Sequence, residues 1–389
     1  MKNRTPAKDK GKMEKRIGGQ SRVLVAKASY EAIDPVLNRI LDSLDLRFWY
    51  DGLTGKTVFI KPNMIGLFPP EHHATTHPSI VHSLVKFFRQ AGAEVTVGDN
   101  CGVGGYGLNQ RVAEVTGIAG AASGTYKNVA LDTALVKLNS KYMESIAVSR
   151  DMIEADVLIN VPKMKTHSLT IVSGAVKNMF GVVAGAGKSQ CHKSAAAVRD
   201  FGELLGDIYS VRPPDLTIMD GIVAMEGNGP TSGKPKPLGR ILASTSAIAL
   251  DAVMCRIMGI LPDEIIHLRY LTQKGFGNID PKSIEVIGEM PEISRFKLPV
   301  TIKRFGFLGW LVNKSFFQAI AKSRMVLEES LCKKCGICLA GCPTKAMEMD
   351  GFPRINEDKC IKCMCCHELC PESAWKSGRF LLRFQGRQL

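Results

Sequence analysis

Eight cysteines near the C-terminal end carry the strongest chemical signal in this sequence of 389 residues. Nine of the twelve cysteines lie between residues 332 and 370, and eight of them form two runs with the spacing C-x2-C-x2-C-x3-C-P, offset by 28 residues. This spacing is typical of chains that hold two [4Fe-4S] clusters, because three thiolates of one run and the fourth of the other surround each cluster. We therefore predict two [4Fe-4S] clusters, the first held by Cys332, Cys335, Cys338 and Cys370 and the second by Cys360, Cys363, Cys366 and Cys342.

Zinc binding and disulfide formation are the other common uses of clustered cysteines. Zinc sites usually combine two C-x2-C pairs across a longer spacer, and the lysine-rich first 20 residues contain no apolar secretory stretch. We therefore expect a small α+β two-cluster ferredoxin-like domain over residues 327–375, with electron transfer as its chemistry and a reducing, cytoplasmic setting. The remaining cysteines are interpreted as a spare thiol or as packing residues: Cys365, Cys101, Cys191 and Cys255.

Three lysines, a histidine and an asparagine gather within residues 163–178, directly after an apolar stretch. Such a group attracts carboxylate or phosphate, and a lysine among other cations loses its proton more readily. The sequence therefore predicts an anionic small molecule as the ligand. The candidates for catalysis are Lys163, Lys165, His167 and Lys177.

Ionisable and amide side chains also follow other predicted strands. The carboxyl ends of parallel strands lie along one edge of a sheet, where ligands collect. Each of these residues could instead cap a helix or shape a turn, and the acids could balance the lysine charge or hold a metal. The candidates for substrate binding are Lys61, Asn63, Asp99, Asn178, Asp220, Glu226, Asn228 and Asp251.

Residues 21–290 predict an α/β domain, with a large mixed, mostly parallel sheet and helices around it. Its clearest unit is a strand at 57–60, a helix that begins at Pro78 and stops at Gly92, and a strand at 95–97. Further strands are expected at 23–26, 157–161, 216–219 and 284–287, and further helices near 34–46, 194–210 and 248–258.

The formal net charge of +14 lies outside the predicted α/β domain. Residues 1–17 contribute +5, residues 294–325 contribute +7 and residues 376–389 contribute +4, so the rest of the chain is close to neutral. A basic groove for nucleic acid is therefore not expected. We interpret residues 1–20 as a disordered basic tail and residues 376–389 as a basic C-terminal extension.

The segment 291–326 is rich in aromatic residues as well as in cations. We interpret it as a connector that packs the ferredoxin-like domain onto the α/β domain. The alternative is a helix that contacts anionic lipid at a membrane surface, or that docks an acidic redox partner protein. No stretch of the sequence is long and apolar enough to predict a membrane-spanning helix.

Two glycine-rich stretches have the composition of nucleotide-binding loops but not their context. The stretch 102–107 matches G-x-G-x-x-G, yet polar residues separate it from the preceding strand and no strand ending in an acid follows at the right distance. The stretch 181–189 ends in Gly-Lys-Ser, but it has one residue too many for a phosphate-binding loop. We interpret this second stretch as a flexible lid.

Seven short motifs of the α/β region occur in a characteristic order. Together they resemble the prokaryotic family called domain of unknown function 362, which is often fused to a C-terminal two-cluster ferredoxin domain. The resemblance spans residues 22–290 and supports the fold and the pairing of domains, but it implies no reaction. The motifs are 60–63 (IKPN), 75–78 (TTHP), 98–99 (GD), 161–167 (VPKMKTH), 176–181 (VKNMFG), 220–230 (DGIVAMEGNGP) and 249–252 (ALDA).

The sequence thus predicts an iron–sulfur oxidoreductase that passes electrons between two [4Fe-4S] clusters and an anionic small molecule bound by the α/β domain. A covalent link between the two domains motivates this hypothesis, because it keeps the electron donor close to the ligand. One alternative is an electron carrier without chemistry of its own, whose α/β domain docks a redox partner protein. Another is a protein whose clusters are structural and whose α/β domain does chemistry without electron transfer.

Overall fold

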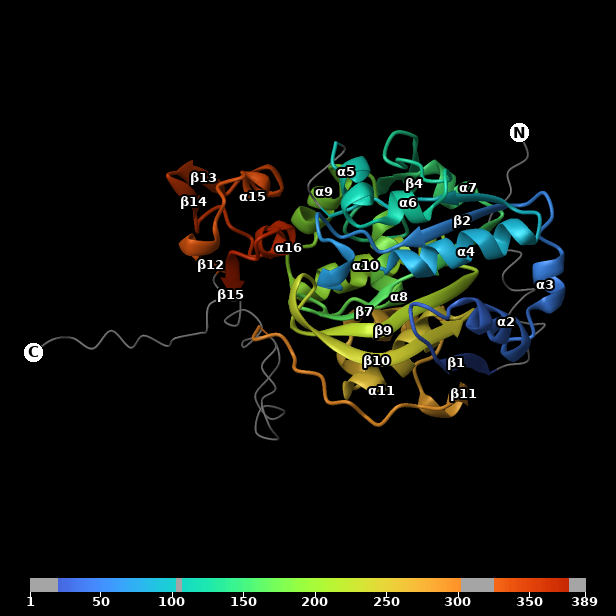
Figure 1. Cartoon of the computed structure of the whole chain (residues 1–389). Coiled ribbons are helices and arrows are strands. Elements are labelled where there is room, and N and C mark those ends of the chain that lie inside the picture. The colour runs from blue at the N-terminus through green and yellow to red at the C-terminus, as the bar shows by residue number, and fades with distance from the viewer. Residues whose placement is uncertain (1–19, 103–106, 302–324, 378–389) are drawn as a thin grey trace, which may run out of the picture.

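The structure is a computed structural model that describes residues 20–102, 107–301 and 325–377. Most of the predicted basic tail and of the connector, and nearly all of the C-terminal extension, lie outside these ranges. A large α/β domain comes first along the chain, and a small domain with short strands and helices follows it (Figure 1). Helix α16 of the small domain faces the α/β domain (Figure 1).

The main sheet of the α/β domain is mixed, as predicted. Its strands lie in the order β11-β1-β10-β9-β6-β2-β3, and only the two pairs that involve β10 are antiparallel. Two further strands, β7 and β8, continue from β9, and β4 and β5 form a separate hairpin. The strands are β1 (Ser21–Lys27), β2 (Thr57–Pro62), β3 (Glu94–Val97), β4 (Thr133–Lys137), β5 (Ser145–Ser149), β6 (Val157–Val161), β7 (Lys163–His167), β8 (Ile171–Val172), β9 (Leu216–Asn228), β10 (Ser232–Ser244) and β11 (Ile284–Gly288).

Helices cover both faces of this sheet, because the buried strands are apolar on both sides. Along β2, Phe59 packs into one apolar core, whereas its neighbours Val58 and Ile60 pack into the other. Helices α10 and α11 contribute to the first core, and helices α2 and α4 contribute to the second. The helices are α2 (Asp34–Ser43), α3 (Arg47–Asp51), α4 (Pro78–Gln90), α5 (Asn109–Val115), α6 (Ile118–Ala121), α7 (Arg150–Glu154), α8 (Ala175–Asn178), α9 (Gly187–Ser194), α10 (Val198–Val211), α11 (Ala247–Met258) and α12 (Ile266–Gln273), with 3-10 turns η1 (Pro70–His72), η2 (Met179–Val182), η3 (Pro262–Glu264) and η4 (Pro281–Ser283).

The small domain consists of two similar halves. Strand β12 pairs with β15, and β13 pairs with β14, so each pair closes one side of the domain. A short helix follows the first cysteines of each run. The elements are β12 (Met325–Leu327), η5 (Glu329–Leu331), α15 (Ile337–Ala340), β13 (Met347–Asp350), β14 (Phe352–Ile355), α16 (Cys365–Leu369) and β15 (Trp375–Ser377).

The predicted fold class is confirmed, and the predicted strands and helices of the α/β domain are present. Strand β9 is longer than expected, and its antiparallel partner β10 was not predicted. Strand β10 carries Pro235, Pro237 and three basic residues, a composition that disfavours a strand. It forms because it pairs along nearly its whole length with β9.

Candidate functional site

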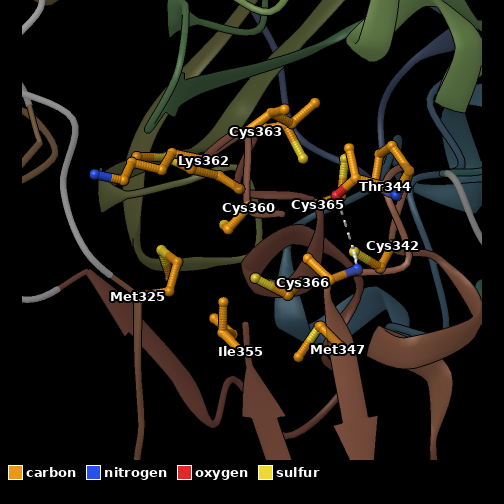
Figure 2. A pocket seen from close by; sticks show the side chains of 14 residues that line it. Met325, Cys342, Thr344, Met347, Ile355, Cys360, Lys362, Cys363, Cys365 and Cys366 are labelled. Carbon is orange, nitrogen blue, oxygen red and sulfur yellow. Dashed lines mark hydrogen bonds between the residues drawn. The ribbon is translucent and has the colours of Figure 1, made fainter. Parts of the chain in front are cut away.

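A pocket in the small domain is surrounded by sulfur atoms. Figure 2 shows the labelled cysteine side chains arranged around this space, with Lys362 extending away from it. Cys360, Cys363 and Cys366 of the second run line the pocket together with Cys342 of the first run, which is the set predicted for the second cluster. Met325, Met347 and Ile355 supply an apolar wall (Figure 2).

The chemistry of these sulfur atoms fits an iron–sulfur cluster. None of the twelve cysteines forms a disulfide within the described residues. Backbone N–H groups donate to the predicted ligands: Ala346 N to Cys342 Sγ and Ala374 N to Cys370 Sγ, each at 3.2 Å. Hydrogen bonds to ligand sulfur stabilise the charge of a bound cluster and tune its potential. The assignment of ligands to each cluster stays a prediction.

The 28-residue offset between the cysteine runs is also present in the backbone. Lys334 and Lys362 both have positive φ, as do Lys345 and Ser373, and the members of each pair are 28 residues apart. The two N–H to Sγ hydrogen bonds show the same offset. Left-handed backbone at non-glycine residues costs energy and persists only where the surroundings require it. Both halves therefore adopt the same cysteine-presenting loop.

The lysines predicted at the strand ends lie inside the α/β domain, and two of them form buried ion pairs. Lys61 Nζ lies 2.8 Å from Asp99 Oδ1, and Lys163 Nζ lies 2.7 Å from Asp220 Oδ2. Burial lowers the pKa of both lysines, and the neighbouring carboxylates oppose this effect. Because each charge is compensated internally, neither ammonium group is available to an anion in this conformation.

The Lys163–Asp220 pair belongs to a larger hydrogen-bond network. Tyr30 Oη donates to Asp220 Oδ1 at 3.1 Å, and His77 N donates to Asp220 Oδ2 at 3.0 Å. The rings of Tyr30 and His77 stack with their centroids 3.7 Å apart. Burial raises the pKa of Tyr30 well above its ordinary value, so this phenol stays protonated and acts as a donor.

The third lysine, Lys165, begins a chain of amides that crosses the strand ends. Its ammonium group donates to Asn63 Oδ1 at 2.8 Å, Asn63 Nδ2 donates to Asn178 Oδ1 at 2.9 Å, and Asn178 Nδ2 donates to Asn160 Oδ1 at 2.8 Å. Burial and the nearby Lys177 charge hold the pKa of Lys165 well below its usual range. The structure thus brings Lys165, Asn63 and Asn178 together, as predicted, and adds Asn160.

Three predicted binding residues have other roles. Glu226 forms an ion pair with Lys236 at 3.0 Å and accepts from Lys297 N at 3.1 Å, and Asn228 Oδ1 accepts from Val300 N at 2.9 Å. These contacts hold the described start of the connector against the end of β9. Asp251 accepts from the backbone N–H groups of Ala175 and Val176, so it caps helix α8. Asp251 itself lies in helix α11, so it caps a neighbouring helix and not the N-terminal turn of its own.

Helix α16 of the small domain lies against the end of β7. His367 donates from Nδ1 to Trp375 O at 2.7 Å within its own domain, and its Nε2 lies 3.3 Å from Asn228 O of the α/β domain. Leu369 lies so close to Gly102 that a Cβ there would be 3.0 Å from the leucine methyl group. The helix that follows Cys363 and carries Cys366 thus contacts the α/β domain directly.

A carboxylate of α16 lies beside the predicted catalytic residues. Glu368 Oε1 is 3.2 Å from His167 Nε2, and only 14% of the Glu368 side chain is exposed. The other ring nitrogen of His167 accepts from Leu169 N at 3.1 Å. Burial and the neighbouring lysines hold the pKa of His167 well below its usual range, so this histidine is neutral and presents an N–H to Glu368.

Lys177 completes this group with an ammonium that has no hydrogen-bond or ion-pair partner in the described part of the chain. Its side chain is partly buried and lies over the Phe180 ring at 5.9 Å. Burial lowers its pKa, and the charge of Glu368 opposes this effect. Of the predicted catalytic residues, His167 therefore contacts the Glu368 carboxylate, the charges of Lys165 and Lys177 act on it, and Lys163 is paired with Asp220.

Sequence reasoning missed Glu368, His367 and Lys188. Lys188 lies in helix α9, not in a flexible lid, and it donates to the carbonyl groups of Asn100 and Cys101. A comparison of the two cysteine runs could have indicated His367 and Glu368. At the positions equivalent to His367 and Glu368, the first run has Leu339 and Ala340.

Asp251 gives the domain a predicted pH dependence, because burial raises its pKa to about 7 in the folded state. Its ordinary value is about 4, so between these pH values the folded state binds the proton and the unfolded state does not. The contribution of the Asp251 carboxyl to the free energy of unfolding is therefore greatest below about pH 4, and it is lost as the pH rises to about 7. The free energy of unfolding of the wild type minus that of Asp251→Asn should fall across this window, as measured by denaturant unfolding at each pH.

Asp280→Asn provides the matched control, because Asp280 caps a turn in the same way from an exposed position. A difference between wild type and Asp251→Asn that stays constant from pH 4 to pH 7 would show that the carboxyl of Asp251 is not the buried group described here.

These features define a class of protein: an iron–sulfur protein in which a ferredoxin-type domain is joined to a mixed α/β domain. The chain belongs to the family described as Domain of unknown function (DUF362), which matches residues 58–256. Residues 324–371 match the 4Fe-4S dicluster domain. The family and the C-terminal iron–sulfur domain expected from the sequence are confirmed.

Curated relatives match each part of the chain. The thylakoid-associated protein sll1697 of Synechocystis sp. is 33% identical over 219 residues, which cover 54% of this chain and 65% of that protein. The uncharacterized polyferredoxin-like protein MJ1302 of Methanocaldococcus jannaschii is 40% identical over 62 residues, covering 12% of this chain and 36% of that protein. A ferredoxin of Pyrobaculum islandicum is 38% identical over 53 residues, which cover 13% of this chain and 50% of that protein. The chain spans less than two thirds of each relative.

Among solved structures, the lactate racemase apoprotein from Thermoanaerobacterium thermosaccharolyticum aligns with a TM-score of 0.40 and 15% identity, covering 64% of this chain and 58% of that chain. Within the described residues, no helix combines the length and the apolar character needed to cross a bilayer.

Proposed function

We propose that this protein is a cytoplasmic oxidoreductase that passes electrons between two [4Fe-4S] clusters and a small anion bound at the end of β7. Helix α16 is the observation that carries this proposal. It holds a predicted cluster ligand, Cys366, and two residues later it places Glu368 against His167. A single turn of helix α16 therefore separates a predicted cluster ligand from the contact with His167 of the α/β domain.

The clusters would supply one-electron transfer, and the residues of the α/β domain would bind and orient the anion. Lys177 offers an ammonium group without a partner among the described residues, and His167 offers an N–H from a neutral imidazole. Lys165 is held in place by Asn63 and lies near both. The pKa of Lys177 is lowered by burial, so it can give up a proton more readily than an exposed lysine.

The test begins with protein purified without oxygen. Small molecules released from it by acid are identified by mass spectrometry, and the released fraction is then added to protein whose clusters have been reduced with dithionite and freed of excess reductant. We expect the visible absorbance of the clusters to return, and to return at least about tenfold more slowly in Lys177→Met, because the variant lacks the unpaired ammonium.

Lys193→Met is the matched control, because Lys193 is an exposed lysine of nearby helix α9. It should behave as the wild type does. Equal rates in Lys177→Met and in the wild type, or a released fraction that contains no anion, would contradict the proposal.

The alternative function is that of an electron carrier whose α/β domain docks a redox partner protein. One observation favours it: Lys61, Lys163 and Lys165 already have internal partners and are buried, so they do not form an open anion pocket in this conformation. In that case, reduced protein would reoxidise at the same rate with and without the released small molecules.

A further inference from the structure

The carboxylate of Glu368 lies where a small anion would be expected to bind. It comes from the iron–sulfur domain, yet its neighbours are the cationic and N–H groups of the α/β domain. His167 Nε2 is 3.2 Å away; burial raises the pKa of Glu368, and the charges of Lys177, Lys165 and Lys188 oppose this effect. A buried carboxylate is stable only where such groups compensate its charge.

The contact between Glu368 and His167 is close but incomplete. Glu368 Oε1 and His167 Nε2 are both buried, and neither has a hydrogen bond of good geometry within the described residues. Lys177 also lacks a partner there. A buried donor without an acceptor costs free energy, so this group of residues can bind a better-placed acceptor than Glu368.

The internal repeat indicates that Glu368 is not needed to hold a cluster. The two runs share their cysteine spacing, their left-handed backbone positions and their N–H to Sγ hydrogen bonds, but Ala340 of the first run replaces Glu368. The glutamate is present only on the helix that contacts the α/β domain. Its role therefore concerns that contact.

We infer that Glu368 occupies the position of a substrate carboxylate, so that a small carboxylate, which Lys177 also attracts, competes with helix α16 for His167. This inference rests on the proposed function. When the anion binds, helix α16 loses its contact with the α/β domain through Glu368 but keeps its contacts through His367 and Leu369. Binding of the anion therefore changes the contacts of the helix that carries Cys366.

The test compares the affinity of the anaerobically purified, cluster-loaded protein for malonate, measured by titration calorimetry, in the wild type and in Glu368→Gln. Glutamine keeps the size of the side chain and removes its charge. We expect Glu368→Gln to bind malonate about tenfold more tightly, because the internal competitor has been removed. Glu372→Gln, which neutralises an exposed glutamate of the same domain, should bind as the wild type does.

Hydrogen exchange of residues 365–369 provides a second measurement on the same samples. Malonate should accelerate exchange there in the wild type, whereas Glu368→Gln should exchange rapidly with or without malonate. Inorganic phosphate tests whether the site takes other oxyanions, and sodium chloride at equal ionic strength must have no such effect. Equal or weaker malonate binding by Glu368→Gln, no binding by either protein, or an equal effect of chloride would overturn the inference.

These outcomes are separate from those of the proposed function. The clusters of the same samples are reduced with dithionite and followed by electron paramagnetic resonance. A protein whose clusters exchange electrons with the released small molecules, but whose malonate affinity does not depend on Glu368, would retain the oxidoreductase function and lose the competition.

Discussion

Replacing Cys363 by alanine is expected to remove one cluster and leave the other. Anaerobically purified wild type should contain about eight iron atoms per chain, and Cys363→Ala about four, because a cubane lacking one of its four thiolates is readily lost. Cys342→Ala should have the same effect on the same cluster, although Cys342 belongs to the first run. Iron analysis and electron paramagnetic resonance of the reduced protein measure both.

Cys365→Ser is the matched control, because this buried thiol begins the helix that follows Cys363 and lines the same pocket but falls outside the ligand spacing. It should keep about eight iron atoms. A loss of iron in Cys365→Ser that equals the loss in Cys363→Ala, or the loss of a different cluster in Cys342→Ala, would contradict the ligand assignment.

Replacing Lys163 by methionine is expected to destabilise the α/β domain by about 3 kcal/mol, because it leaves the carboxylate of Asp220 buried without its countercharge. Tyr30 Oη and the backbone of His77 still donate to that carboxylate, but they bring no positive charge. The double variant Lys163→Met/Asp220→Asn should recover part of this loss, since asparagine is neutral and keeps an acceptor. Chemical denaturation measures each free energy of unfolding.

The control is the exposed pair between Lys86 and Asp34, whose side chains are 54% and 51% exposed. Lys86→Met should change the free energy of unfolding by less than about 1 kcal/mol, because water screens this pair. If Lys163→Met were as mild as Lys86→Met, the Lys163–Asp220 pair would not be the buried contact seen here.

The parts of the fold that follow from local pattern could be predicted from the sequence. The buried strand β2 and the helix that begins at Pro78 have clear signals, because apolar runs and helix caps depend on few neighbouring residues. Strand β10 could not be predicted, because its prolines and basic residues are tolerated only through pairing with β9, which is a tertiary effect. The cysteine spacing predicted the iron–sulfur domain because spacing alone fixes the geometry of the ligands.

The candidate site was predicted in composition but not in arrangement. Lys165, His167 and Lys177 come from β7 and α8, which are close in sequence, and their charges act on one another. The sequence could not show that Lys163 would be neutralised by Asp220, because that pairing joins distant segments. The sequence also could not show that Glu368 would lie against His167, because contacts between two domains have no local signal in the sequence.

Electron paramagnetic resonance of the whole protein, purified without oxygen and reduced with dithionite, tests the central claim most directly. The claim is that the two cysteine runs hold two [4Fe-4S] clusters and so allow the chain to transfer electrons. We predict the signal of two reduced clusters that interact with each other. Colourless protein that contains no iron and gives no paramagnetic signal after reduction would contradict the claim.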